Sequence, residues 1–275
     1  TGTGIPAEFL YKPVSVTADA AGRIYAVSQS SNMGVLSFDP NGEFENFIGV
    51  QKVTYSTSEL FWRSLMTEAQ RERSVQNIPV DFNDIEMDSE GFLFVTSAAV
   101  DKSKQYSALV GRSTTSDYAP VKRLNTSGDD ILKRNGFFPP AGDLDIDTTQ
   151  KIDSAVSAFI GVTVNELGLY TVLDTTAQRL FTYDENGSLL GVCGGVGTSI
   201  GQFMSATAIA YKGHSLTVLD DTSGVLTVMA LSDIGKKIEE AIALQNELLF
   251  DEALKKWEEI LPLDRNLDSI YMDMG

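Results

Sequence analysis

The pattern of apolar and polar positions between residues 160 and 190 predicts a series of short β-strands. The strand-like segments are residues 162–165, 169–174 and 180–184, followed by a strand that begins at Leu189. Polar turns separate them, and Asp184-Glu185-Asn186-Gly187 has the sequence of a hairpin turn whose glycine can adopt positive φ. We therefore expect a four-stranded antiparallel meander in this part of the chain.

The same pattern recurs along the chain. Similar segments begin at Val14, Asp84 and Ile209, and their turn glycines are Gly22, Gly91, Gly168 and Gly213. The last two glycines are 45 residues apart, which matches the ~40–45-residue period of a propeller blade. The intervals of 69 and 77 residues before them predict insertions. Tandem sheets that cannot bury both faces alone indicate a mainly β fold, a β-propeller.

The residues that make up this repeat resemble NHL repeats over about 14–231. The resemblance rests on strands that end in Phe-Asp or Tyr-Asp, on Asn-Gly turns, and on a linker with Gly195-Val196-Gly197-Thr198 and Gly201-Gln202-Phe203. Ser205-Ala206 stands where that family usually has Asn-Pro. NHL repeats build six-bladed propellers in many extracytoplasmic bacterial proteins. Four blades are readable here, so we expect two earlier blades outside this chain, with a closed four-bladed propeller as the alternative.

Two insertions interrupt the blades. Residues near 57–76 have helical spacing and a capping box at Thr67-Glu68-Ala69-Gln70. Within it, Trp62 and Arg63 are candidate partner contacts, although an apolar stripe on a short helix often serves only to hold it on the fold. The second insertion, residues 98–119, is rich in Ser and Thr, which predicts a long exposed loop or an added hairpin.

After Leu231 the period changes from two to 3.6, so residues 232–275 are expected to be helical. They resemble TPR units through Ala241 on a first helix and Phe250, Ala253 and Trp257 on a second, with Leu248 where a turn glycine is usual. The resemblance implies that Gln245 and Asn246 face a peptide-binding groove; ordinary solvated positions are the alternative. Residues 267–275, with Tyr271 and Gly275 in packing positions, resemble the first helix of another unit. Because a single unit buries its faces poorly, we expect further repeats or docking of these helices on the propeller.

Charge limits the classes of partner. The formal net charge of −17 opposes binding to nucleic acid or anionic membranes, since both depend on Lys and Arg contacts with phosphate. No apolar run reaches the ~18 residues of a membrane span. The lone cysteine, Cys193, excludes an intramolecular disulfide, and its strand-end context predicts a buried small apolar residue.

Candidate catalytic chemistry is sparse. His214 is the only histidine and lies in a predicted turn, where a solvated side chain is expected, and no nucleophile elbow accompanies it. The acidic run 143–147 lacks the glycine and the final glutamate of an EF-hand. One Cys and one His cannot form a zinc site. Candidate oxygen ligands at strand starts are Asn83, Asp84, Asn165 and Asp220.

Two functions follow from these residues. The first is a non-catalytic binding or scaffold protein that uses propeller and TPR surfaces to hold a protein or peptide, without a cofactor. The alternative is a hydrolase or lyase resembling lactonases, which would hold a divalent cation such as Ca²⁺ at the central channel through the four residues above. A third hypothesis, carbohydrate recognition, rests on Trp62 and Tyr106. The resemblance to NHL proteins implies an extracytoplasmic or cell-surface location.

Overall fold

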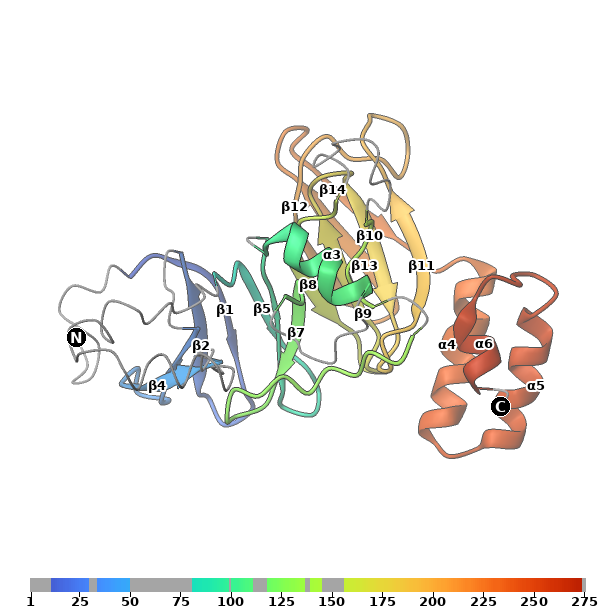
Figure 1. The fold of residues 1–275 in the computed structure, drawn as a ribbon, viewed down its shortest axis with the longest axis horizontal. Helices are drawn as coiled ribbons and strands as arrows, with labels where there is room; N and C mark the ends of the chain where they lie inside the picture. Colours follow the sequence, from blue (N-terminus) through green and yellow to red (C-terminus); the bar gives the residue numbers. More distant parts are fainter. Residues whose placement is uncertain are drawn as a thin grey trace.

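In the computed structural model the chain forms four antiparallel β-sheets followed by a helical tail (Figure 1). The structure describes residues 11–29, 34–49, 81–98, 100–110, 118–136, 139–144 and 156–273. The first sheet lies at one end of the molecule and the helices lie at the other (Figure 1). Among the described residues, no helix is both long and apolar enough to cross a bilayer.

Each sheet is an antiparallel meander of strands that are consecutive along the chain. Short turns join the strands within a sheet, except that the longer segment with the helix α3 lies between β6 and β7. The first sheet contains β1 (Pro13–Ala18), β2 (Ile24–Ser28), β3 (Val35–Phe38) and β4 (Phe44–Ile48). The second contains β5 (Asp84–Met87), β6 (Leu93–Thr96) and β7 (Val121–Leu124). The third contains β8 (Phe159–Val164), β9 (Tyr170–Asp174), β10 (Arg179–Tyr183) and β11 (Leu189–Gly194). The fourth contains β12 (Ala206–Lys212), β13 (Ser215–Asp220) and β14 (Val225–Met229). The meander predicted between residues 160 and 190 is therefore confirmed as the third sheet.

The first strands of successive sheets lie beside one another. β1 contacts β5, β5 contacts β8, and β8 contacts β12. Propeller blades are arranged in this way, with their first strands side by side and their remaining strands extending outward. The fold is mainly β, and its four sheets form a propeller-like arrangement.

Apolar side chains fill the spaces between neighbouring sheets. Val35 and Val95 lie in the core between the first and second sheets, and Phe159 lies in the core between the second and third. Leu180 and Val218 join the third sheet to the fourth. All five residues of β9 are buried, so this strand is covered on both faces and shows no alternation in its sequence.

Six hairpin turns share one structure. In each, the side-chain oxygen of an Asp or Asn accepts hydrogen bonds from the backbone N–H groups two and four residues later. The glycine three residues after it has a φ of 81° to 86°, a conformation that glycine adopts without steric cost. The turns begin at Asp19, Asp39, Asp88, Asn125, Asn165 and Asp184. Gly22, Gly91 and Gly168 belong to this set, which explains why they mark the repeat; Gly213 lies in a shorter turn.

The second insertion differs from the prediction. Residues Lys102–Val110 form a helix, α3, instead of an exposed loop or hairpin. Asp101 precedes it, and its carboxylate accepts a hydrogen bond from the N–H of Ser103 at 3.0 Å, as an N-cap residue does. The frequent Ser and Thr residues around this segment concealed a stretch that contains neither Gly nor Pro. The helical insertion expected near 57–76, with Trp62 and Arg63, lies outside the described residues.

The tail consists of α4 (Asp233–Asn246), α5 (Phe250–Ile260) and α6 (Asp268–Asp273). Its helices lie close to the predicted positions. Ser232 caps α4 by accepting a hydrogen bond from the N–H of Gly235 at 3.1 Å. Leu248, at the position where a turn glycine was expected, has a φ of 62°.

Candidate functional site

The helical tail packs on the third sheet through a shared apolar core. Trp257, Ile260 and Ile270 are fully buried in this core, and Leu169 contributes to it from the turn before β9. A buried Leu or Ile side chain contributes about 1.5–3 kcal/mol relative to an exposed one. For the tail we expected either further repeats or docking on the propeller. The structure shows that the tail docks on the third sheet.

The tail residues predicted to pack divide into two groups. Ala241, Ala253 and Trp257 are buried as expected. Phe250 and Tyr271 are not: 62% and 56% of their surfaces are exposed, respectively.

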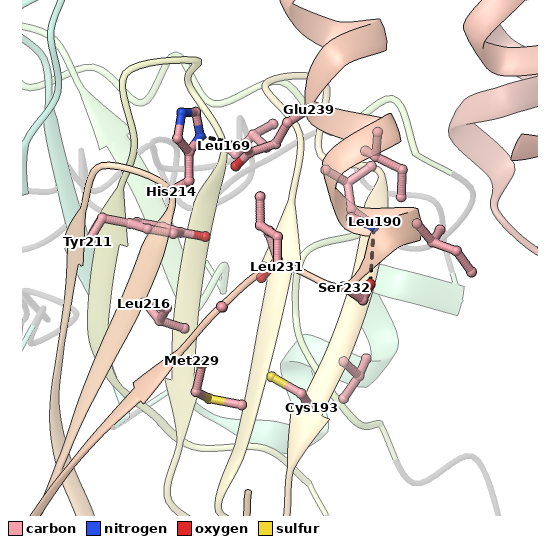
Figure 2. A pocket seen from close by; sticks show the side chains of 17 residues that line it. Leu169, Leu190, Cys193, Tyr211, His214, Leu216, Met229, Leu231, Ser232 and Glu239 are labelled. Carbon is pink, nitrogen blue, oxygen red and sulfur yellow. Dashed lines mark hydrogen bonds and ion pairs between the residues drawn. The ribbon is translucent and has the colours of Figure 1, made fainter.

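A cavity of about 300 Å³, which we call the junction cavity, lies between α4 and the third and fourth sheets (Figure 2). Its walls are mostly apolar side chains, contributed by β11, the fourth sheet and α4. They include Leu190, Leu216, Met229, Leu231, Ile234 and Ile238. Its size and composition match the lower end of the range for small-molecule sites, ~300–1,000 Å³.

The polar end of the junction cavity is formed by His214 and Glu239 (Figure 2). The His214 Nδ1 and Glu239 Oε2 atoms are 2.6 Å apart, while the other oxygen of Glu239 accepts a hydrogen bond from Asn165 Nδ2 at 3.2 Å. The His214 side chain is 78% exposed and that of Glu239 only 8%. His214 is thus exposed, as predicted for a turn histidine, but it also forms a contact between the fourth sheet and α4.

Two further groups of the cavity wall titrate. The hydroxyl of Tyr211 is 2.7 Å from Thr171 Oγ1, and burial raises the pKa of Tyr211 above its usual value. The prediction that Cys193 is buried is wrong, because β11 is the outer strand of its sheet and the residue is exposed. The surrounding cavity wall still raises the pKa of the Cys193 thiol by desolvation.

A second cavity, also of about 300 Å³, lies between the hairpin turns and the end of α4. We call it the turn cleft. Its charged residues are Asp88, Glu90, Arg123, Lys133, Glu166 and Glu185. Arg123 lies 2.5 Å from Asp88 and 2.8 Å from Glu90, and Lys133 lies 3.0 Å from Glu185. With four acidic and two basic groups, the turn cleft favours a positively charged occupant.

Asn246, one of the binding residues predicted from the sequence, lies at the turn cleft. It lines the turn cleft, and its Nδ2 donates a hydrogen bond to the carbonyl oxygen of Leu167 at 3.3 Å. Gln245 is half-buried one position earlier on α4. Tyr106 is half-buried on α3.

The four candidate cation ligands all form hydrogen bonds with other protein groups. Asn83 Nδ2 donates to the carbonyl oxygen of Phe159 at 2.9 Å. Asp84 accepts from Ser15 Oγ at 2.6 Å and from the N–H of Val162 at 2.9 Å, so it joins three first strands.

The other two lie at the far ends of their strands. Asn165 begins the β8–β9 turn. Asp220 ends β13 and accepts backbone hydrogen bonds from Met204 and Ser223. These bonds lower the pKa of Asp220 to about 2, with the Ser223 N–H contributing most. Each of the four side chains is therefore engaged by protein groups. Among the described residues, no group of three or more His, Cys, Asp or Glu side chains could hold a metal ion.

Sequence reasoning missed Glu239 as a site residue, because an acidic residue on an amphipathic helix is ordinarily solvated. Its position one turn before Ala243 and directly after Ile238, on the buried side of α4, was the available signal. The turn cleft could not be predicted from the sequence either, since its residues come from the second and third sheets and from α4.

No family model matches the chain, and no curated protein matches it. Similar solved structures include virginiamycin B lyase from Staphylococcus aureus, at 11% identity and a TM-score of 0.41, with 81% of this chain and 57% of that one covered. A protein of unknown function from Bacteroides caccae is 12% identical, with a TM-score of 0.38 and coverage of 83% and 64%. Another, from Bacteroides thetaiotaomicron, is 13% identical, with a TM-score of 0.45 and coverage of 79% and 47%. The chain thus spans between 47% and 64% of the lengths of these proteins, and none of their properties is transferred to it.

Proposed function

We propose that the chain is a non-catalytic binding protein, an NHL-type propeller with a TPR-like tail, and that it holds a protein or peptide partner at the turn cleft. The observation that carries this proposal is the position of Asn246, which brings the end of α4 to the cleft formed by the hairpin turns. A partner in this cleft would contact both the propeller-like part and the tail. Because the chain resembles NHL proteins, many of which are extracytoplasmic, we also propose that it acts outside the cytoplasm.

Exposed apolar side chains begin two residues after Asn246. Leu248, Leu249 and Phe250 are 72%, 40% and 62% exposed. Three consecutive large apolar residues at a loop tip are unusual on a free surface, and such patches often mark interaction sites. Together with the acidic excess of the turn cleft, they favour a partner segment that combines basic and apolar residues.

Site-specific photocrosslinking would test this proposal. A photoreactive residue in place of Phe250 is expected to crosslink a partner, whereas one in place of exposed Thr222, in the β13–β14 turn, is not. Capture should weaken at high salt, because screening reduces the attraction between an acidic cleft and a basic partner. It should also be lost when Asn246 is changed to Arg, which adds bulk and positive charge at the cleft.

Equal crosslinking from both positions, or capture that is insensitive to Asn246→Arg, would contradict the proposal. The conservative variant Asn246→Gln serves as the matched control and should retain capture.

A further inference from the structure

The junction cavity has an apolar body and a single acidic group. Its walls include leucine, isoleucine and methionine side chains from β11, β13, β14 and α4. Among its 17 lining residues there is one carboxylate, Glu239, and there is neither Lys nor Arg. A ligand that fills this cavity would need an apolar portion, and an anionic head group would find neither Lys nor Arg in the wall.

Glu239 keeps capacity for a further hydrogen bond. A carboxylate has about four acceptor positions, and the two bonds described above, from Asn165 and His214, use one on each oxygen. These bonds fix the side chain in place, so its remaining acceptor positions are preorganised. A protonated amine supplies up to three N–H donors and a positive charge, which makes it the matching group.

The two ends of the junction cavity differ in polarity. Figure 2 shows His214 and Glu239 at one end of the cavity and Met229 and Cys193 toward the other. His214 and Cys193 are both exposed, so solvent reaches the cavity wall at both ends. A ligand with its amine at Glu239 would therefore extend its apolar part toward Met229 and Cys193.

From these observations we propose that the junction cavity binds a small amphipathic amine, with its ammonium group on Glu239 and its apolar body between α4 and the third and fourth sheets. The inference is independent of the proposed partner binding, because the turn cleft shares no lining residue with this cavity.

Cys193 provides the test, since it is the only cysteine of the chain and it lines the cavity. The full chain would be treated with iodoacetamide in the presence of phenethylamine, phenethyl alcohol or phenylacetate, and alkylation followed by mass spectrometry. The three probes share one apolar body and differ in the charge of the head group. We expect phenethylamine to slow alkylation at the lowest concentration, the alcohol to require about tenfold more, which is the effect of one charge-assisted hydrogen bond, and phenylacetate to protect least.

A matched control separates binding from direct effects on the reagent. In a Cys193→Ser, Thr222→Cys variant, the reactive cysteine lies in the exposed β13–β14 turn, and none of the probes should slow its alkylation. In the Glu239→Gln variant, which can still hydrogen-bond Asn165 and His214, the amine and the alcohol should protect Cys193 equally. His214→Ala should retain the preference for the amine.

The proposal is overturned if phenethylamine and phenylacetate protect Cys193 equally, if Glu239→Gln keeps the preference for the amine, or if none of the probes protects Cys193. None of these outcomes bears on partner capture at the turn cleft, so failure of either proposal can be recognised separately.

Discussion

The carboxylate of Glu86 on β5 accepts a hydrogen bond from the hydroxyl of Thr163 on β8, with 3.2 Å between Oε1 and Oγ1. Thr163 Oγ1 in turn accepts a hydrogen bond from the backbone N–H of Tyr211 on β12 at 3.0 Å. Through these two bonds a buried polar chain joins the first strands of three sheets. Hydrogen-bonded groups of this kind specify how neighbouring sheets align, while the apolar cores provide most of the stability.

The first prediction concerns the pH dependence of stability. Burial raises the pKa of Glu86 from 4.5 to about 7, so the folded chain binds a proton there that the unfolded chain has already lost. Between pH 4.5 and about pH 7, the free energy of unfolding falls as the pH rises, because the unfolded state binds fewer protons than the folded state. Glu86→Gln removes the ionisation and keeps an acceptor for Thr163.

Urea unfolding between about pH 4.5 and pH 8 would check this prediction. Glu86→Gln should unfold like the wild type at the acidic end and at a higher urea concentration at the alkaline end. Glu43→Gln, in an exposed turn, is the control and should follow the wild type throughout. A Glu86→Gln variant that loses stability equally at every pH would contradict the assignment of this carboxyl group.

The second prediction concerns the α4–α5 turn. Leu248 has a φ of 62°, and the left-handed conformation costs a residue with a Cβ about 1–2 kcal/mol. Leu248→Gly should therefore stabilise the chain by about 1 kcal/mol, after allowance for the extra entropy of glycine in the unfolded state. Chemical denaturation measures the change.

Leu249→Gly is the matched control for that substitution. Leu249 has a φ of −88°, so glycine relieves no strain there and should destabilise by about 0.5–1 kcal/mol. Stabilisation by both substitutions would show that loss of exposed apolar surface, and not backbone strain, is responsible.

The third prediction concerns docking of the tail. Trp257 is fully buried between the helices and the third sheet, so Trp257→Ala should cost about 3–5 kcal/mol, the usual penalty for such a cavity. Limited proteolysis should then cleave within residues 232–273 while the sheets remain protected. Phe250→Ala, at a 62% exposed position, should change stability by no more than about 0.5 kcal/mol. Loss of the sheets together with the tail in Trp257→Ala would show that the two parts unfold as one unit.

The fourth prediction concerns divalent cations. Because Asn83, Asp84, Asn165 and Asp220 are all engaged in hydrogen bonds with protein groups, calcium and zinc are expected to leave the thermal midpoint unchanged relative to chelator. A site occupied at 100 times its dissociation constant would add about 2.7 kcal/mol and raise the midpoint measurably. A calcium-dependent rise that chelator reverses would restore the hypothesis of a lactonase-like enzyme.

Much of the fold was predictable because its signals are local. The Asp or Asn that begins a turn, the glycine three residues later and the alternation in the flanking strands all act within a few residues, so turns such as the one at Asp184 could be placed from the sequence. The change to a period of 3.6 after Leu231 likewise predicted α4 and α5. By contrast, α3 was missed because its polar composition gives little periodicity, and its Asp101 cap resembles any loop aspartate.

The sites depended on contacts between distant residues. No local pattern distinguishes Glu239 from the other acidic residues of α4; its environment is created by Asn165 and His214, which lie 74 and 25 residues earlier in the chain. In the same way, Cys193 is exposed because β11 is the outer strand of its sheet, a consequence of sheet order. Short-range hydrogen bonding and hydrophobic periodicity were thus enough to predict the third sheet, the turns and the helices α4 and α5. Which polar groups meet could be learned only from the folded molecule, because it depends on how the tail packs against the sheets.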